Sequence, residues 1–128
     1  MKHAIILLAA CFMLSCSKTT ITDPTTTALT TTKTSEPQIT PCMQILIDST
    51  IERPVGELFT QVDAYRYNSA VVYLYIAGCC DRNNDLKDEN CVYLFSPSGG
   101  LMGCGDCMHK NFFAEAAFLG TIWKDPRK

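Results

Sequence analysis

Residues 59–76 read FTQVDAYRY, then NS, then AVVYLYI, and this stretch decides the fold. β-Branched and aromatic residues, which favour strands, dominate both halves of it. Asn68-Ser69 at the centre suits a two-residue hairpin turn, because asparagine tolerates the positive φ that such a turn requires. The sequence therefore predicts an antiparallel β-hairpin in which Phe59–Tyr67 pairs with Ala70–Ile76.

A helix is predicted before the hairpin. Thr40-Pro41 places a hydroxyl at the N-cap and a proline in the first turn, and the helix should end before Pro54. One helical face is expected to pack on the sheet, and it holds Cys42, Ile45, Leu46 and Ser49.

Beyond the hairpin, Cys91–Phe95 is predicted as a third strand, ended by the turn-forming residues Ser96–Gly100. Residues 101–110 are rich in glycine and cysteine and should be irregular. Residues 112–123 are ambiguous, since their first half favours a helix and their second half a strand. The expected fold is a small α+β domain with an N-terminal helix on a short antiparallel sheet and a cysteine-rich irregular half.

Residues 1–15 have the pattern of a secretory signal peptide. A short basic start is followed by the apolar run Ala4–Leu14 and by Ser15. The run is shorter than the roughly 20 residues that a membrane-spanning helix needs. Bacterial lipoproteins are cut directly before a cysteine that is then acylated. Cys11 fits the local cleavage pattern more closely, but Cys16 allows a longer apolar run and leaves an even number of later cysteines, so we expect the lipid on Cys16.

Residues 16–40 are predicted to be the lipidated cysteine and a disordered tether. Eleven of residues 17–41 are threonine, and such a segment has little apolar surface to offset the entropy of ordering. At about 5–6 Å × √n, it would hold the domain roughly 25–30 Å from the lipid surface. The folded domain is then residues 41–128.

A domain of this size gains much from covalent staples. It contains six cysteines, which we expect in structural disulfides, and fifteen pairings of them are possible. These candidates are Cys42, Cys79, Cys80, Cys91, Cys104 and Cys107.

Cys104-Gly105-Asp106-Cys107 has the Cys-x-x-Cys spacing of thiol-disulfide oxidoreductases. Those enzymes place the motif between a strand and a helix, a context that this sequence does not predict. Met108 separates the motif from His109, which argues against attachment of a c-type haem. The cysteines and His109 have the chemistry of zinc ligands, but in a secreted protein we expect disulfides instead.

Asp81-Arg82-Asn83-Asn84-Asp85 matches the first three ligand positions of a calcium loop. It lacks the glycine and the distal glutamate of that loop, so an acidic surface turn is the alternative. The candidate calcium ligands are Asp81, Asn83, Asp85 and Asp88, with Asp106 as a further carboxylate.

From Pro41 onward the chain has 8 basic and 11 acidic residues, a net charge of 8 − 11 = −3. Basic residues cluster only in the tail, Lys124–Lys128. A nucleic-acid-binding protein needs a basic surface stripe, so we expect no nucleic-acid partner.

Several short motifs occur together in the predicted domain: Pro41-Cys42, Cys79-Cys80-Asp81, Leu86-x-Asp88, Cys91, Pro97-Ser98-Gly99-Gly100-x-x-Gly103-x-Gly105-Asp106 and Ile122-Trp123-Lys124-Asp125. Together they resemble an uncharacterised family of small Bacteroidota lipoproteins, over residues 41–125. Cys107 and His109 depart from the family pattern, and Cys104 is additional, so no disulfide pairing is carried over from it. The resemblance implies location and architecture only.

The sequence thus predicts an envelope lipoprotein anchored to the outer membrane. Ser17-Lys18-Thr19-Thr20 lacks the acidic residues of surface-exported lipoproteins and favours the periplasmic face. We expect a non-enzymatic binding or structural module without a cofactor, with an unknown protein or glycan as partner. The alternatives are a redox protein that uses Cys104 and Cys107, and a calcium-dependent adhesion module.

Overall fold

The computed structural model describes residues 36–128. The described residues form one compact unit. The predicted signal peptide, Cys11, Cys16 and most of the tether lie outside the described residues.

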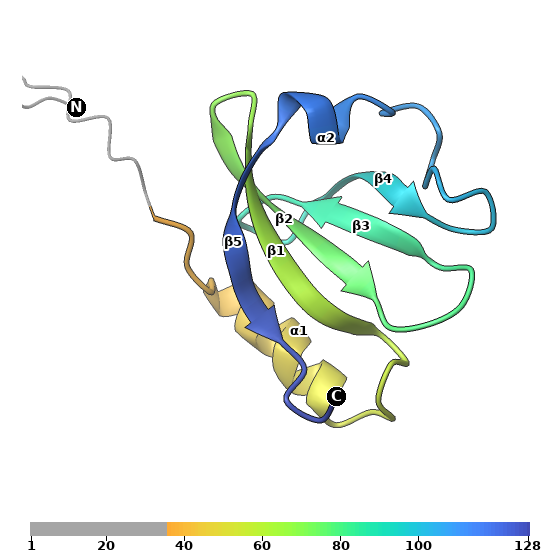
Figure 1. Cartoon of the computed structure of the whole chain (residues 1–128). Coiled ribbons are helices and arrows are strands. Elements are labelled where there is room, and N and C mark those ends of the chain that lie inside the picture. Colours follow the sequence, from red (N-terminus) through yellow and green to blue (C-terminus); the bar gives the residue numbers. More distant parts are fainter. Residues whose placement is uncertain (1–35) are drawn as a thin grey trace, which may run out of the picture. The chain divides into compact units, whose positions relative to one another are not determined.

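The described unit is a small α+β domain built on a five-stranded antiparallel sheet with the strand order β4-β3-β2-β1-β5 (Figure 1). The predicted antiparallel sheet is therefore confirmed. No helix in residues 36–128 is long and apolar enough to cross a membrane. The elements are α1 (Pro41–Ile51), β1 (Phe59–Tyr67), β2 (Ala70–Ala77), β3 (Asn83–Lys87), β4 (Tyr93–Gly99), α2 (Phe112–Glu115) and β5 (Ala117–Lys124).

Strands β1 and β2 form the predicted hairpin, with Tyr67 opposite Ala70 at its closed end. Asn68 and Ser69 have φ values of 48° and 67°, as a type I′ turn requires. The hairpin lies at the centre of the sheet, between β5 and β3, so this local sequence signal organises the whole domain.

Helix α1 begins at Pro41, and the Thr40 side chain accepts a hydrogen bond from the Met43 N–H at 3.4 Å. Its buried face differs from the predicted one. Met43, Ile47 and Thr50 are buried, whereas Ile45 is exposed. Cys42 and Leu46 of the predicted face are partly buried and pack against the same cluster, so the buried face is only turned toward Met43 and Ile47.

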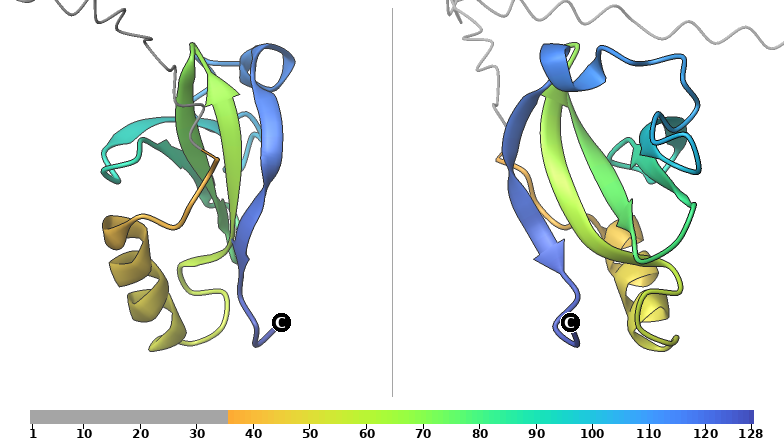
Figure 2. Two further views of the ribbon diagram at one scale, coloured as in Figure 1. Left: turned by 90° about the vertical axis from the view of Figure 1, so that its left-hand side faces the viewer. Right: turned by 45° about the vertical axis from the view of Figure 1, so that its right-hand side comes forward.

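Both faces of the sheet carry a hydrophobic cluster. On one face, Met43 and Ile47 of α1 pack with Tyr73 and Tyr75, and the left view of Figure 2 shows α1 on that side of the strands. On the other face, Val72 and Leu74 alternate with the tyrosines and pack with Leu86, Phe95 and Phe112. The tyrosines of β2 therefore serve sheet packing.

The prediction of an acidic surface turn is wrong for residues 83–87, which form strand β3. Leu86 in β3 is fully buried, and the polar residues beside it bind neighbouring strands. Asn84 accepts from the Ala77 N–H of β2 at 2.8 Å and donates to Ser98 Oγ of β4 at 3.0 Å. Asp85 accepts from Ser96 Oγ at 2.9 Å. These bonds offset the low strand propensity of asparagine and aspartate.

Strand β4 begins two residues later than predicted and continues through the Ser-Pro-Ser segment that was expected to end it. It is an edge strand, where a proline without an N–H is tolerated. The turn begins at Gly99 and Gly100, both with positive φ. Residues 112–123 contain both alternatives, since α2 is followed directly by β5.

The C-terminal residues bind the end of α1. Arg127 donates to the carbonyl oxygens of Thr50, Ile51 and Arg53 at 3.1, 2.6 and 2.7 Å. Asp125 is buried and accepts from the Arg127 Nε and Nη2 groups at 2.9 and 2.8 Å. These hydrogen bonds from Arg127 lower the pKa of Asp125 to about 2.

Candidate functional site

The loop between β4 and α2 folds back along β4. Gly105 N–H donates to the Gly99 carbonyl at 2.9 Å, and Asp106 N–H donates to the Ser96 carbonyl at 2.9 Å. Gly105 approaches β4 so closely that an added Cβ would overlap the Ser96 carbonyl oxygen. Positive φ values and close backbone contact explain why this segment is rich in glycine.

A disulfide joins Cys104 and Cys107, whose Cα atoms are 4.8 Å apart. The two cysteines of the predicted Cys-x-x-Cys motif therefore bond to each other. The nearest following helix, α2, begins at Phe112 and has four residues, so the motif is not at the start of a long helix. The loop is thus closed by a covalent bond as well as by backbone hydrogen bonds.

Asp106 fixes the base of the loop. Its carboxylate accepts from the Met108 N–H at 2.9 Å, the Ser96 N–H at 3.3 Å and His109 Nδ1 at 3.3 Å. These hydrogen bonds, that from Met108 foremost, lower the pKa of the Asp106 carboxyl group. The His109 ring stacks on Phe95 with ring centroids 3.8 Å apart. Asp106 and His109 thus hold the loop on the domain.

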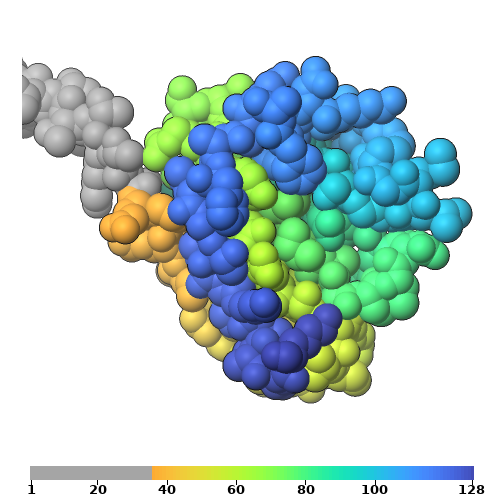
Figure 3. Space-filling view, viewed as in Figure 1, coloured from red at the N-terminus to blue at the C-terminus, as the bar shows by residue number. Residues whose placement is uncertain are grey.

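The same loop exposes three large apolar side chains. Leu101, Met102 and Met108 are 82%, 82% and 78% exposed, and we call them the apolar loop residues. Residues near 100 project at the edge of the molecule opposite the side where residues 36–40 enter the domain (Figures 1 and 3). The anchored base and the bare apolar residues make this loop a candidate binding surface.

Among the hollows on the described part of the surface are two of different size. The larger, of about 380 Å³, includes Met108 of the apolar loop residues and is lined by Tyr67, Met108, His109, Lys110, Asn111, Phe112 and Glu115. The smaller, of about 180 Å³, is lined by Leu46, Leu58, Phe59, Tyr75, Ala77, Arg82, Asn83, Asp85 and Lys87. The larger hollow extends the candidate surface, because Met108 and His109 belong to both.

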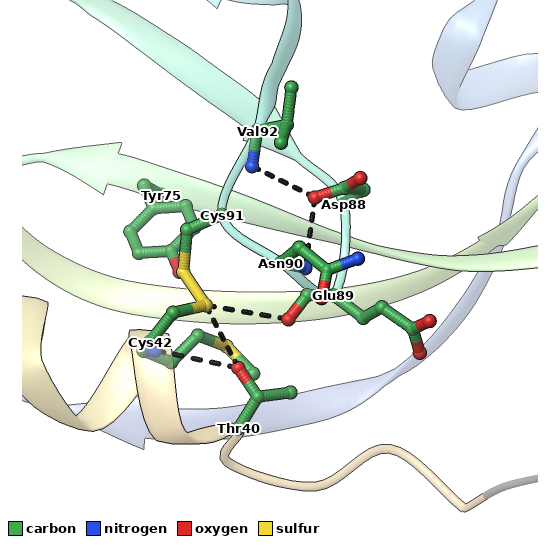
Figure 4. The surroundings of a disulfide bond; sticks show 9 residues. Thr40, Cys42, Tyr75, Asp88, Glu89, Asn90, Cys91 and Val92 are labelled. Atoms are coloured by element: carbon green, nitrogen blue, oxygen red, sulfur yellow. Dashed lines mark hydrogen bonds between the residues drawn. A yellow bond between two sulfur atoms is a disulfide. The ribbon is translucent and has the colours of Figure 1, made fainter. Parts of the chain in front are cut away.

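A second disulfide, Cys42–Cys91, ties α1 to the loop between β3 and β4 (Figure 4). Thr40 Oγ1 lies 3.1 Å from the Cys42 sulfur. Asp88 Oδ1 accepts from the N–H groups of Asn90 and Val92 at 2.9 and 2.8 Å, which orders the loop that carries Cys91. This arrangement is a structural staple.

The predicted calcium ligands are not brought together. Asp88 binds its own loop, Asp85 binds β4, and Asp81 lies in the turn before β3. Within residues 36–128 there is no group of three or more His, Cys, Asp or Glu side chains that could hold a metal ion.

The fold thus brings the six cysteines of the domain together in three pairs. Two pairs are disulfides, and Cys79 and Cys80 are free and exposed at the turn between β2 and β3. Sequence reasoning singled out every cysteine but missed the apolar loop residues. Their signal was present, since Leu101-Met102 follows two glycines in a segment expected to be a turn.

Comparison with known proteins gives one family. Residues 48–125, from within α1 to the residue after β5, match the family described as Domain of unknown function (DUF6970). Neither the curated proteins nor the solved structures contain a match. The match spans more than half of the chain, and we conclude that this protein belongs to the DUF6970 family.

Proposed function

We propose that this protein is a lipid-anchored envelope lipoprotein of the Bacteroidota, with a non-enzymatic binding module as its folded domain. Cys16 carries the lipid after removal of residues 1–15, and the threonine-rich segment is the tether. Each buried CH₂ of a lipid contributes about 0.8 kcal/mol, so an anchor of two or three chains is effectively permanent. The preferred location is the periplasmic face of the outer membrane.

The observation that carries the binding role is the apolar loop. This loop is held in place by a disulfide and by backbone hydrogen bonds, and yet it exposes the apolar loop residues to solvent. Exposed apolar patches on soluble proteins often mark sites of protein–protein interaction. The loop lies opposite the side where residues 36–40 enter the domain, so these residues do not cover it (Figure 1). We place the partner in the surrounding compartment.

The partner surface is proposed to be an apolar patch on another protein. Leucine and methionine bury apolar area and adapt in shape, and methionine is frequent at protein-binding surfaces. The adjoining hollow, which contains Tyr67 and Phe112 as well as Met108, gives the partner a recess to fill.

The test is site-specific photo-crosslinking in the native cells. A photoreactive residue at Leu101 should give one discrete adduct, and the same residue at exposed Glu52, directly after the C-terminal end of α1, should not. Combining Met102→Ser with Met108→Ser should remove the adduct. The purified partner should then bind the wild-type protein and not this variant. Equal adducts from Leu101 and Glu52 would reject the proposed surface.

A redox role for the Cys104–Cys107 pair is the second candidate, and the observation in its favour is that these two cysteines bond to each other. A catalytic disulfide should be reduced by thioredoxin-type reductants at mild potential. A structural disulfide should resist the same reductants until the domain unfolds.

A further inference from the structure

Cys79 and Cys80 are adjacent in sequence, and their sulfur atoms are 2.6 Å apart. Both are exposed in the turn between β2 and β3. They are the free cysteines of the described residues, since the other four are in disulfides. Neither disulfide accounts for this pair.

The turn that carries the pair is held by its surroundings. Gly78 N–H donates to the Leu58 carbonyl at 3.2 Å, and Lys128 Nζ donates to the Gly78 carbonyl at 3.1 Å. The Arg82 guanidinium donates to the Glu57 carbonyl. An added Cβ at Gly78 would overlap the backbone of Gly56, so the chain fits closely there. The two thiols are therefore kept near each other by the fold.

The backbone of Cys80 matches that of the bonded cysteines. Within residues 36–128, five residues other than glycine have positive φ, and three of them are cysteines: Cys80, Cys91 and Cys107. Cys91 and Cys107 are each one member of a disulfide. A left-handed conformation is unfavourable for a residue with a Cβ, and in this domain the other cysteines that adopt it are cross-linked.

We propose that Cys79 and Cys80 are a reversible redox pair that closes a vicinal disulfide by exchange with a low-molecular-weight disulfide. The Cys79 thiolate attacks one sulfur of the reagent RSSR, forms the mixed disulfide Cys79–S–SR and releases RS⁻. Cys80 then loses its proton, attacks the Cys79 sulfur and releases the second RS⁻. Two thiols are oxidised, RSSR is reduced to two RSH, and the remaining bond joins Cys79 to Cys80.

The order of attack follows from the hydrogen bond within the pair. The Cys80 thiol donates to the Cys79 sulfur, and this bond raises the pKa of the Cys80 thiol. Cys80 therefore holds its proton while Cys79 reacts. The reaction needs only these two residues and the reagent, so it does not depend on the proposed anchor or partner.

The test uses the purified full chain, with oxidised glutathione as the reagent and alkylation of remaining thiols before digestion. Trypsin cuts after Arg66 and Arg82, so peptide 67–82 contains Cys79 and Cys80 as its only cysteines. We expect this peptide alone, two hydrogen atoms lighter than its reduced form, without alkyl groups or a glutathione adduct. Mild reductant should restore two alkylatable thiols while the domain stays folded.

The Cys80→Ser variant is the matched control, because it keeps the turn and removes only the second nucleophile. It should stop at the mixed disulfide and carry a full equivalent of glutathione on Cys79. A wild-type peptide 67–82 that is doubly alkylated, that keeps an adduct, or that is cross-linked to another peptide would overturn the proposal.

Discussion

Loss of the Cys42–Cys91 disulfide should cost this domain much of its stability. The bond closes a loop with a sequence separation of 49. The chain-entropy relation for such a loop gives roughly 4 kcal/mol at 25 °C. Cys104–Cys107 closes a separation of only 3, for which the same relation gives roughly 1.5–2 kcal/mol. We therefore predict that removing Cys42–Cys91 lowers the free energy of unfolding by more than removing Cys104–Cys107 does.

The assay is urea unfolding followed by the fluorescence of Trp123, the single tryptophan, which packs on Phe59 with ring centroids 5.4 Å apart. For a small domain with a slope of about 1 kcal/mol per molar urea, a loss of about 4 kcal/mol lowers the midpoint by several molar. The variant Cys42→Ala/Cys91→Ala should therefore unfold at far lower urea than Cys104→Ala/Cys107→Ala.

The result that refutes this reasoning is a smaller loss for the long loop than for the short one. It would mean that the helix is held to the sheet by its apolar contacts and by Arg127, without help from the staple. Equal losses would show that each disulfide acts through local packing and not through the entropy of the unfolded chain.

Three further predictions concern other parts of the domain. The folded pKa of Asp125, about 2, lies below its ordinary value of 3.8, so its carboxylate stabilises the fold above about pH 4 and loses this effect as the pH falls toward 2. Asp125→Asn should lower the melting temperature at pH 7 and flatten its decline between pH 4 and 2; an unchanged acid profile would contradict the assignment. Gly103→Ala should cost roughly 1–2 kcal/mol for its positive φ alone, and Gly105→Ala clearly more, because only the second adds a clash with Ser96. Thermal melts of both variants decide this, and equal losses would mean that the loop does not lie against β4. Replacing the three apolar loop residues by serine should change stability by less than about 0.5 kcal/mol, and a large drop in melting temperature would show that they serve packing instead of binding.

Local chemistry made part of the fold predictable. The hairpin follows from an Asn-Ser turn between two β-rich runs, and the start of α1 follows from a hydroxyl cap before a proline. These signals act within a few residues and do not depend on the rest of the domain. Strand β3 could not be found in this way, because Asn84 and Asp85 form a strand only through partners on β2 and β4.

The candidate site, like the fold, could be predicted only in part from local sequence. The cysteines and the Gly-Asp segment stand out in the sequence, but their pairing depends on which loops the sheet brings together. Cys91 meets Cys42 because α1 packs across the sheet, and no spacing rule encodes that contact. The exposure of the apolar loop residues could be recognised only from the folded structure, because sequence alone does not show which apolar side chains stay unburied.

The most direct test of the account is the chemical identity of the first residue in the protein purified from its own cells. Mass spectrometry of the N-terminal peptide should find Cys16 as the first residue, carrying fatty acyl chains, in the membrane fraction. A protein that still begins with an unmodified Met1, or that is recovered without lipid, would contradict the account.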